Sequence, residues 1–559
     1  MDKIWLKSYS SSVPAQIDIE KINPPDALSR TANRFPDNAA LIFQGAKITF
    51  KQLDDMVSRF ASALVDLGVK PGDTVATLLP NIVQMVVAIF GALRAGATVA
   101  LNNPLYTDRE LEHQYNDSNS KFLVCLDLLV PRMIGLRPKT KITKIISCHI
   151  RDYLPFPLKQ LFPFVRKGMH LKTPTAHNVY EFIDLVKKFP PLKNPHKAAW
   201  EDTALLLYTG GTTGVSKGVQ LTNANISSNV QQCRAWFYEF TDGAETVVGC
   251  LPFFHSFGLT TAMNMAIYYG YANILIPKPE PKSILESIQK FKATYIPAVP
   301  TLYNGMINFP DLKKYDISTI RGCFSGGAPL PLETIRKWEE LTGAQICEGF
   351  GLTETTPVAT INPLGGNTKP GSIGLPIPNT DAKLVHVDDF HQEITAFNEP
   401  GELCIKGPQV MKGYINRPEE TELTLRDGWL LTGDIAIVDE EGYFSIVDRK
   451  KDMIISGGFN IYPRDVDEVL FAHPKVLEAC AIGVPDTYSG ERIKAFVVLK
   501  PGETSTPIEI IDYCKVNLVK YKVPKYVEFV SELPKSAVGK ILRKELKKMD
   551  QEKSASASK

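Results

Sequence analysis

Short apolar runs alternate along the chain with longer amphipathic stretches. Residues 121–125, 273–276 and 479–482 are runs of the length and apolar character that buried strands have. Segments with a helical spacing of apolar residues lie between such runs, for example residues 51–67. Buried strands that alternate with helices are typical of a sheet covered by helices, so the pattern predicts an α/β fold.

Length and the distribution of glycines and charges predict more than one domain. A chain of 559 residues exceeds a single compact domain. The glycine-dense region 351–413 contains many short strand candidates and predicts a β-rich lobe. A charged pentad, residues 448–452, separates two apolar strands and predicts a domain boundary. We therefore expect an N-terminal domain over 1–450, a small α+β C-terminal domain over 451–546, and a disordered Lys/Ser/Ala-rich tail over 547–559.

The most apolar stretch, residues 82–101, does not resemble a membrane span. Gln84, Gly91, Arg94 and Gly96 interrupt it, which predicts a buried helix followed by a strand. The N-terminus has no apolar core of signal-peptide length. None of the nine cysteines has Cys-x-x-Cys spacing, so we expect reduced, mostly buried thiols in a cytoplasmic protein.

Charge is nearly balanced, with 63 Lys+Arg against 61 Asp+Glu. A general nucleic-acid binder needs an excess of basic charge, so we expect no nucleic-acid partner. One local segment, residues 151–174, combines five Lys/Arg with many aromatic and aliphatic residues. Such a segment can lie in a membrane interface, although its prolines argue against one continuous helix. A peripheral membrane contact and a surface insertion packed on the core are both open interpretations.

A glycine-rich loop, residues 208–218, follows the apolar run 204–207. Glycines let backbone amides approach a phosphate, and threonine hydroxyls and a lysine add donors and charge. The loop is not a Walker A motif, because Gly218 rather than Ser or Thr follows Lys217. It is not a dinucleotide fingerprint either, since Gly210 lacks a glycine two residues on. The loop therefore predicts a binding site for the phosphates of ATP.

The same loop contains a competing motif. Residues 214–218 fit the Gly-x-Ser-x-Gly nucleophile elbow of α/β-hydrolases. In that elbow a strand leads directly into the serine, whereas the run before Ser216 is rich in glycine. We interpret Ser216 as a loop hydroxyl, and turnover without ATP would distinguish the hydrolase.

Together with this loop, seven further segments occur in an order that resembles the adenylate-forming superfamily, which includes acyl-CoA synthetases, luciferases and peptide-synthetase adenylation domains. They are residues 251–255 (LPFFH), 325–330 (SGGAPL), 348–354 (EGFGLTE), 431–434 (LTGD), 447–452 (VDRKKD), 456–460 (SGGFN) and 534–540 (PKSAVGK). The likeness to bacterial long-chain fatty acyl-CoA synthetases covers the whole chain and is weakest over residues 126–197.

The resemblance implies a two-step reaction with ATP, a fatty acid and coenzyme A as substrates and Mg²⁺ as cofactor. The acid first forms an acyl-adenylate, and the coenzyme A thiol then displaces AMP. A medium-chain or aryl-acid CoA ligase similar to 4-coumarate ligases, and a fatty acyl-AMP ligase, remain open alternatives. A lipid-binding scaffold is disfavoured because Lys540, Glu354 and Lys217 are all present. A homodimer also remains open.

The resemblance assigns roles to individual residues. The implied catalytic residues are Lys540, Thr353, Glu354 and His255, and the implied Mg²⁺ ligands are Thr209 and Glu354. The implied nucleotide-binding residues are Thr209, Gly210, Gly211, Thr212, Thr213, Gly214, Lys217, Gly327, Ala328, Pro329, Glu348, Gly349, Phe350, Gly351, Leu352, Asp434 and Arg449. Gly457, Gly458 and Phe459 are implied to bind coenzyme A, and Lys451 to be the hinge of a mobile C-terminal domain.

Overall fold

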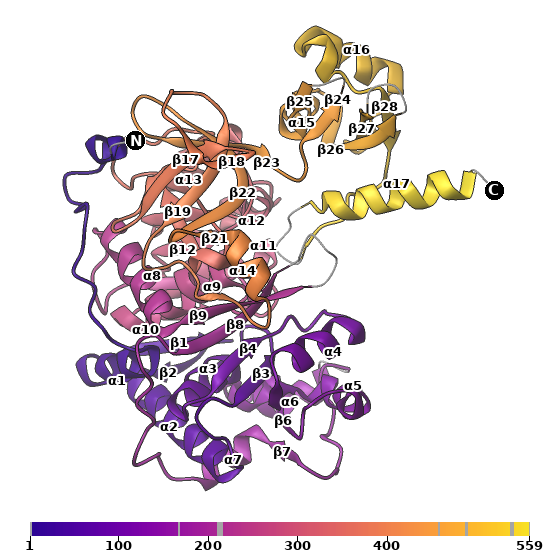
Figure 1. The fold of residues 1–559 in the computed structure, drawn as a ribbon. Coiled ribbons are helices and arrows are strands. Elements are labelled where there is room, and N and C mark those ends of the chain that lie inside the picture. The colour runs from indigo at the N-terminus through magenta and orange to yellow at the C-terminus, as the bar shows by residue number, and fades with distance from the viewer. Residues whose placement is uncertain are drawn as a thin grey trace. The chain divides into compact units, whose positions relative to one another are not determined.

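The structure is a computed structural model that describes residues 3–165, 168–209, 216–456, 459–486, 490–536 and 541–557 (Figure 1). The chain divides into two compact units. The larger unit contains Trp5–Asp381 and Ile405–Leu430, and the smaller contains Ala382–Cys404 and Leu431–Lys559 with the extreme N-terminus.

The first sheet of the larger unit has nine strands among the described residues. It is parallel from β14 to β1, and antiparallel strands extend it at both edges. The order is β16 (Leu375–Pro376), β15 (Val358–Ile361), β14 (Ile346–Gly351), β13 (Gly322–Ser325), β12 (Tyr295–Ala298), β10 (Thr246–Gly249), β11 (Ala272–Leu275), β1 (Ala39–Phe43) and β2 (Ala46–Thr49).

The second sheet has eight strands within the described part of the chain. It is parallel from β8 to β7, whereas β9 and β20 are antiparallel. The order is β20 (Gly413–Tyr414), β9 (Lys217–Thr222), β8 (Thr203–Thr209), β4 (Thr98–Leu101), β3 (Thr74–Leu78), β5 (Ser120–Leu126), β6 (Lys144–Cys148) and β7 (Val179–Glu181).

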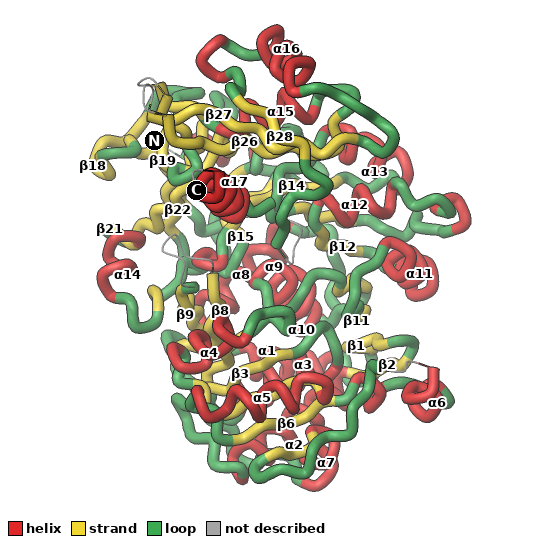
Figure 2. Tube along the Cα trace, turned by 90° about the vertical axis from the view of Figure 1, so that its right-hand side faces the viewer, coloured by secondary structure: helices red, strands yellow, loops and turns green. Residues whose placement is uncertain are grey.

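Helices connect the strands of both sheets and pack against them (Figures 1 and 2). They are α1 (Pro24–Arg34), α2 (Phe50–Asp66), α3 (Val83–Arg94), α4 (Asp108–Asp117), α5 (Val130–Leu136), α6 (Leu158–Val165), α7 (Phe182–Lys188), α8 (Asn223–Trp236), α9 (Ser256–Gly258), α10 (Met265–Tyr269), α11 (Pro281–Phe291), α12 (Pro300–Ile307), α13 (Leu332–Thr342) and α14 (Pro418–Thr424).

The apolar stretch 82–101 forms α3 and β4, as predicted. Every residue of α3 is buried, including Arg94, whose guanidinium lies 2.6 Å from an Asp54 carboxylate oxygen. This ion pair compensates the burial of the charge. No helix in the described part of the chain is long and apolar enough to cross a membrane.

Two sheets form most of the smaller unit. In the first, β22 carries β23 on one side and β19 on the other, and β21 makes a hairpin with β22. Its strands are β17 (Asp381–His386), β18 (Asp389–Ile394), β19 (Gly401–Lys406), β22 (Trp429–Val438) and β23 (Phe444–Arg449), and the short β21 (Leu425–Arg426) comes from residues of the larger unit. The second has the order β25 (Phe459–Ile461), β24 (Ile454–Ser456), β27 (Gly490–Leu499) and β26 (Val476–Asp486), with β28 (Tyr526–Phe529) on β27.

Helices α15 (Pro463–Phe471), α16 (Pro507–Asn517) and α17 (Arg543–Ala557) complete the smaller unit. Ile454, Val466, Leu470, Ala495 and Ile510 are fully buried in one apolar core beside its second sheet. The α/β class and the smaller second domain are therefore confirmed. The domain limits at 450 and 546 remain predictions.

The C-terminal segment differs from the sequence prediction. Composition predicts disorder from residue 547, whereas helix α17 continues to Ala557. Contacts explain the difference: Leu546 is fully buried, and Asp550 accepts a hydrogen bond from the Lys494 ammonium at 2.5 Å. Lys553 forms a further ion pair with Glu528. These anchors offset the weak apolar character of the helix.

Candidate active site

The two ends of the predicted phosphate loop face each other across a strand pair. Thr209 ends β8, Lys217 begins β9, and the two residues are partners in the antiparallel register. The His113 ring Nε2 lies 2.9 Å from the backbone oxygen of Ser216 and holds the second end. Gly210, Gly211, Thr212, Thr213 and Gly214 lie outside the described residues.

Ser216 does not have the setting of a hydrolase nucleophile. A strand, β9, follows it, whereas the elbow motif requires a helix after the serine. The Gln114 amide reaches the Ser216 hydroxyl at 3.4 Å, and His113 contacts its backbone rather than its hydroxyl. The geometry favours a loop hydroxyl.

Tyr414 joins Lys217 to Glu354. Its hydroxyl donates a hydrogen bond of 2.8 Å to Glu354 Oε1, and the Lys217 ammonium lies 4.9 Å from the centre of its ring. Lys217 also forms an ion pair with Glu420. Burial, together with the charge of Glu354, raises the pKa of Tyr414 well above its usual value, so its hydroxyl remains a hydrogen-bond donor.

The backbone around Glu354 is fixed by a short 3₁₀ turn, η7 (Thr353–Thr355). The amide of Met411 donates to the carbonyl of Glu354 at 2.8 Å, and the Thr355 hydroxyl accepts from the amide of Leu352 at 2.9 Å. Glu354 itself is half-buried, so one carboxylate is held at the margin of the unit. A carboxylate plus a threonine hydroxyl is a donor set that suits Mg²⁺, which prefers hard oxygen ligands and completes its shell with water and phosphate.

The predicted adenine-binding segments lie at the ends of neighbouring parallel strands. Ser325 of β13 pairs with Glu348 of β14, and Gly327, Ala328 and Pro329 follow β13 directly. The buried Glu348 carboxylate accepts the amide hydrogen of Leu330 at 3.1 Å and so ties the two segments together.

Packing within the protein already explains two of the predicted nucleotide-binding glycines. A Cβ on Gly351 would lie 1.7 Å from the backbone oxygen of Pro357, and one on Gly349 would lie 2.5 Å from the Phe324 ring. Phe350 between them is half-buried, as are Leu352 and Thr353.

His255 has a structural role in this structure. It precedes α9, and its Nδ1 accepts the amide hydrogen of Phe257 at 3.3 Å. The ring is half-buried, and its predicted catalytic role remains a prediction.

Asp434 and Arg449, the predicted ribose contacts, form a cross-strand pair in the smaller unit. They are register partners on β22 and β23, and Arg449 Nε lies 2.9 Å from Asp434 Oδ1. The Asp434 side chain is 3% exposed. The ion pair fixes the orientation of the carboxylate, and the ribose contact remains a prediction.

Lys451 lies in a turn between β23 and β24. The amide of Lys450 donates to Gly433 at 3.0 Å, the Lys450 ammonium contacts Glu402 at 2.9 Å, and the amide of Asp452 donates to Arg449 at 2.9 Å. Lys451 therefore lies between two residues that are held by hydrogen bonds, and its role as a hinge remains a prediction. Gly457 and Gly458 lie outside the described residues, and Phe459 begins β25.

The AMP-binding enzyme model matches residues 28–415, and the AMP-binding enzyme C-terminal domain model matches residues 465–540. The chain belongs to the AMP-binding enzyme family. The predicted membership of the adenylate-forming superfamily is thereby confirmed.

Relatives of this AMP-binding enzyme extend over nearly its whole length. A long-chain-fatty-acid–CoA ligase of Bacillus subtilis is 45% identical over 547 residues, 97% of each chain. A long-chain-fatty-acid–CoA ligase of Escherichia coli O157:H7 is 40% identical over 98% of each chain. The structure of the anthranilate CoA ligase AuaEII with anthranoyl-AMP matches with a TM-score of 0.84, at 27% identity, over 98% of this chain and 99% of that one.

Lys540, the predicted catalytic lysine of this AMP-binding enzyme, lies outside the described residues, but both of its flanks are anchored. Lys535 forms a β-bridge with Ile541, and the amide of Leu542 donates to Pro534 at 2.8 Å. The Arg543 guanidinium forms an ion pair with the buried Asp467. Burial raises the pKa of the Asp467 carboxyl, an effect that the charge of Arg543 opposes.

Sequence reasoning missed Tyr414, Asp467 and Arg543. Arg543 could have been suspected, since it lies three residues after Lys540, at which the matched motif 534–540 ends. Tyr414 and Asp467 carry no motif signal of their own, and only the strand pairing and the helix packing show their partners.

Proposed function

We propose that this chain is a long-chain fatty acid–CoA ligase, which converts ATP, a fatty acid and coenzyme A to acyl-CoA, AMP and diphosphate. The observation that carries the substrate class is the 45% and 40% identity to bacterial long-chain-fatty-acid–CoA ligases over nearly the whole of each chain. The predicted enzyme class, an AMP-forming acyl-CoA synthetase, agrees with the family model and with the ligase relatives.

The first step joins the acid to AMP. A carboxylate oxygen of the fatty acid attacks the α-phosphorus of ATP, the bond from that phosphorus to the bridging oxygen breaks, and diphosphate leaves. Thr209, Lys217 and residues 210–214 would bind the phosphates, and Lys217 would exchange Glu420 for a phosphate as its partner. Lys540 would bridge the carboxylate and the α-phosphate, where a cation stabilises the charge of the transition state.

Glu354 and Thr209 would hold Mg²⁺. The ion supplies positive charge beside the departing diphosphate. Tyr414 fixes the Glu354 carboxylate through its hydrogen bond, so the ligand does not need to be ordered when ATP binds. Asp434, paired with Arg449, would bind the ribose, and Gly327–Pro329 with Glu348–Leu352 would border the adenine.

The second step transfers the acyl group to coenzyme A. The thiolate attacks the acyl carbon, and AMP leaves with the electron pair of the anhydride bond. Gly457, Gly458 and Phe459 would border the pantetheine arm, Lys451 would be the hinge between the two steps, and His255 would lie near the acyl carboxylate. A homodimer remains a prediction, which light scattering of the purified chain tests.

Helix α6 supports a peripheral membrane contact. Figure 2 shows α6 at the margin of the larger unit. Apolar side chains in and beside this helix are exposed to solvent. Phe156 is 82% exposed, Phe164 75% and Val165 70%. Arg151, Lys159 and Lys172 add positive charge to the same stretch of sequence, and Arg166 and Lys167 lie outside the described residues. Exposed apolar side chains in a segment that also carries basic residues suit the surface of an anionic bilayer, from which a fatty acid could be collected.

Formation of AMP with a panel of acids tests the proposed substrate class. Saturated acids of increasing chain length, benzoate and coumarate are supplied separately, each with and without coenzyme A. The proposal expects the highest kcat/KM with long chains and acyl-CoA as the product. A preference for benzoate or coumarate would contradict it, and release of the acyl-adenylate without transfer to coenzyme A would support an acyl-AMP ligase instead.

A further inference from the structure

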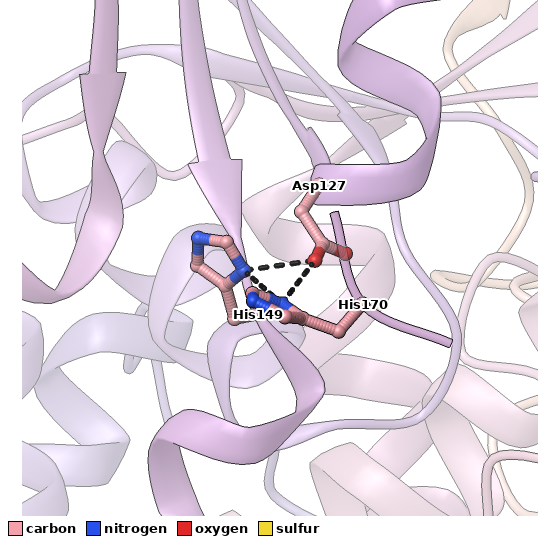
Figure 3. Close-up of side chains that lie close together, drawn as sticks. All are labelled: Asp127, His149 and His170. Atoms are coloured by element: carbon pink, nitrogen blue, oxygen red, sulfur yellow. Dashed lines mark hydrogen bonds and ion pairs between the residues drawn. The ribbon is translucent and has the colours of Figure 1, made fainter. Parts of the chain in front are cut away.

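Three potential metal ligands meet at the end of the second sheet of the larger unit (Figure 3). Asp127 follows β5, His149 follows β6, and His170 lies beyond α6. Strands β5 and β6 are parallel neighbours, so their carboxyl ends bring Asp127 and His149 together. The residues between His149 and His170 include α6, and His170 lies beside the other two residues.

The three ligand atoms form a compact triangle. Asp127 Oδ2 lies 2.8 Å from His149 Nδ1 and 3.1 Å from His170 Nδ1, and the two Nδ1 atoms lie 3.3 Å apart. In a tetrahedral zinc site with metal–ligand bonds of about 2.0–2.1 Å, ligand atoms are about 3.3 Å apart. A shift of a few tenths of an ångström would place an ion at bonding distance from all three.

We propose that Asp127, His149 and His170 bind one divalent transition-metal ion of the Zn²⁺ class. The site is separate from the predicted Mg²⁺ ligands Thr209 and Glu354, and none of its residues belongs to the proposed catalytic machinery. Two imidazoles and one carboxylate are ligands that Zn²⁺ accepts, and a water molecule would complete the shell.

The surroundings orient the ligands as metal sites require. His149 Nε2 lies 3.0 Å from a Glu181 carboxylate oxygen and 3.2 Å from the Thr173 hydroxyl. An Nε2–H that donates to Glu181 leaves the Nδ1 lone pair directed at the ion, which is the usual carboxylate–histidine–metal arrangement. The amides of Leu128 and Leu171 donate to the two oxygens of Asp127, at 2.9 and 2.8 Å.

Without a metal ion, the hydrogen bonds in this cluster place too many donors on one oxygen of Asp127. Asp127 Oδ2 would then accept three hydrogen bonds, from His149, His170 and the amide of Leu171. A carboxylate oxygen offers about two lone pairs. With a metal, Oδ2 binds the ion and the Leu171 amide, which matches its capacity.

Two of the three proposed metal ligands are buried. Asp127 is 1% exposed and His149 5%, so the ion would be held inside the fold. His149 and His170 enclose the segment that carries α6 and its exposed apolar side chains. The ion would therefore pin both ends of this segment to the sheet and limit how it unfolds locally.

Metal content of the full-length, tag-free protein tests the site. Wild type, His170→Ala, His177→Ala and Glu354→Gln are loaded with Zn²⁺ or Co²⁺, dialysed and analysed by mass spectrometry. His177 is an exposed histidine seven residues after His170 and is the matched control, and Glu354→Gln removes the predicted Mg²⁺ ligand.

We expect about one ion per chain in wild type, His177→Ala and Glu354→Gln, and at least a tenfold lower content in His170→Ala. Co²⁺ should give the intense visible absorption of a tetrahedral site in wild type and in His177→Ala, but not in His170→Ala. Zn²⁺ should raise the unfolding temperature of wild type but not of His170→Ala. Wild type that retains less than about 0.1 ion per chain, or a His170→Ala variant that retains as much as His177→Ala, would overturn the proposal.

Discussion

At the scale of single residues, the candidate site depends on partners that hold a charged group in place. Tyr414 holds Glu354, Glu420 holds Lys217, and Arg449 holds Asp434. The first two pairs join segments that are distant in sequence, whereas the third joins the consecutive strands β22 and β23. The motifs identify Glu354, Lys217, Asp434 and Arg449 by resemblance. Tyr414 and Glu420 became visible only through their contacts in the structure.

Tyr414→Phe removes the hydroxyl that orients Glu354. A hydrogen bond to a charged group contributes about 1.5–3 kcal/mol, so we expect the Mg²⁺ concentration for half-maximal adenylation to rise by about tenfold or more. Tyr238→Phe removes a hydroxyl from the same unit without a contact to Glu354 and is the control. Identical magnesium titrations of the two variants would show that Tyr414 does not position a metal ligand.

Lys540→Ala separates the two half-reactions. Loss of one cation from the transition state of adenylation should lower that rate by at least about a hundredfold, as for other charge-stabilising donors. Transfer from supplied acyl-adenylate to coenzyme A should change little. Lys535→Ala, which removes another lysine of the same motif, should leave both rates near wild type. Equal losses in both half-reactions of Lys540→Ala would contradict the assigned role.

At the scale of secondary structure, the pattern of apolar residues predicted correctly those strands and helices that have a buried apolar face. The runs 121–125, 273–276 and 479–482 lie in β5, β11 and β26, and the helical pattern 51–67 corresponds to α2. Composition was wrong for α17, because a few ion pairs and one buried leucine order a segment that is otherwise polar. The cluster of Asp127, His149 and His170 could not be predicted without knowledge that β5 and β6 are neighbours.

The exposed apolar side chains in and beside helix α6 predict binding to anionic lipid vesicles. The double variant Phe156→Ser, Phe164→Ser removes two exposed aromatic rings, each worth about 1.5–3 kcal/mol if it enters an apolar phase. We expect co-sedimentation with anionic vesicles to fall at least tenfold. Leu105→Ser changes a side chain that is 81% exposed elsewhere on the same unit and should bind like wild type.

Two results would contradict the membrane contact. One is that wild type does not bind anionic vesicles at low salt, and the other is that the double variant binds as strongly as Leu105→Ser. Either result would leave residues 151–174 as a surface insertion. Binding that weakens with added salt would support the contribution of the basic residues.

At the scale of the whole molecule, order along the chain identified the enzyme more securely than any single site. Eight segments that occur in the order typical of one superfamily predicted the family. The two family models match residues 28–415 and 465–540. Chain-length preference could not be predicted, because residues distant in sequence form an acyl site and no motif marks them. The hinge at Lys451 lies between the two matched regions and remains a prediction.

The order in which the products form tests most directly the central claim that the chain is a two-step, AMP-forming acyl-CoA ligase. Purified enzyme is mixed with a long-chain fatty acid, ATP and Mg²⁺ without coenzyme A, and the products are followed by mass spectrometry before and after coenzyme A is added. The account predicts that acyl-adenylate and diphosphate form first, and that coenzyme A then converts the adenylate to acyl-CoA and AMP. Formation of acyl-CoA with ADP as the nucleotide product, or without any ATP, would contradict it.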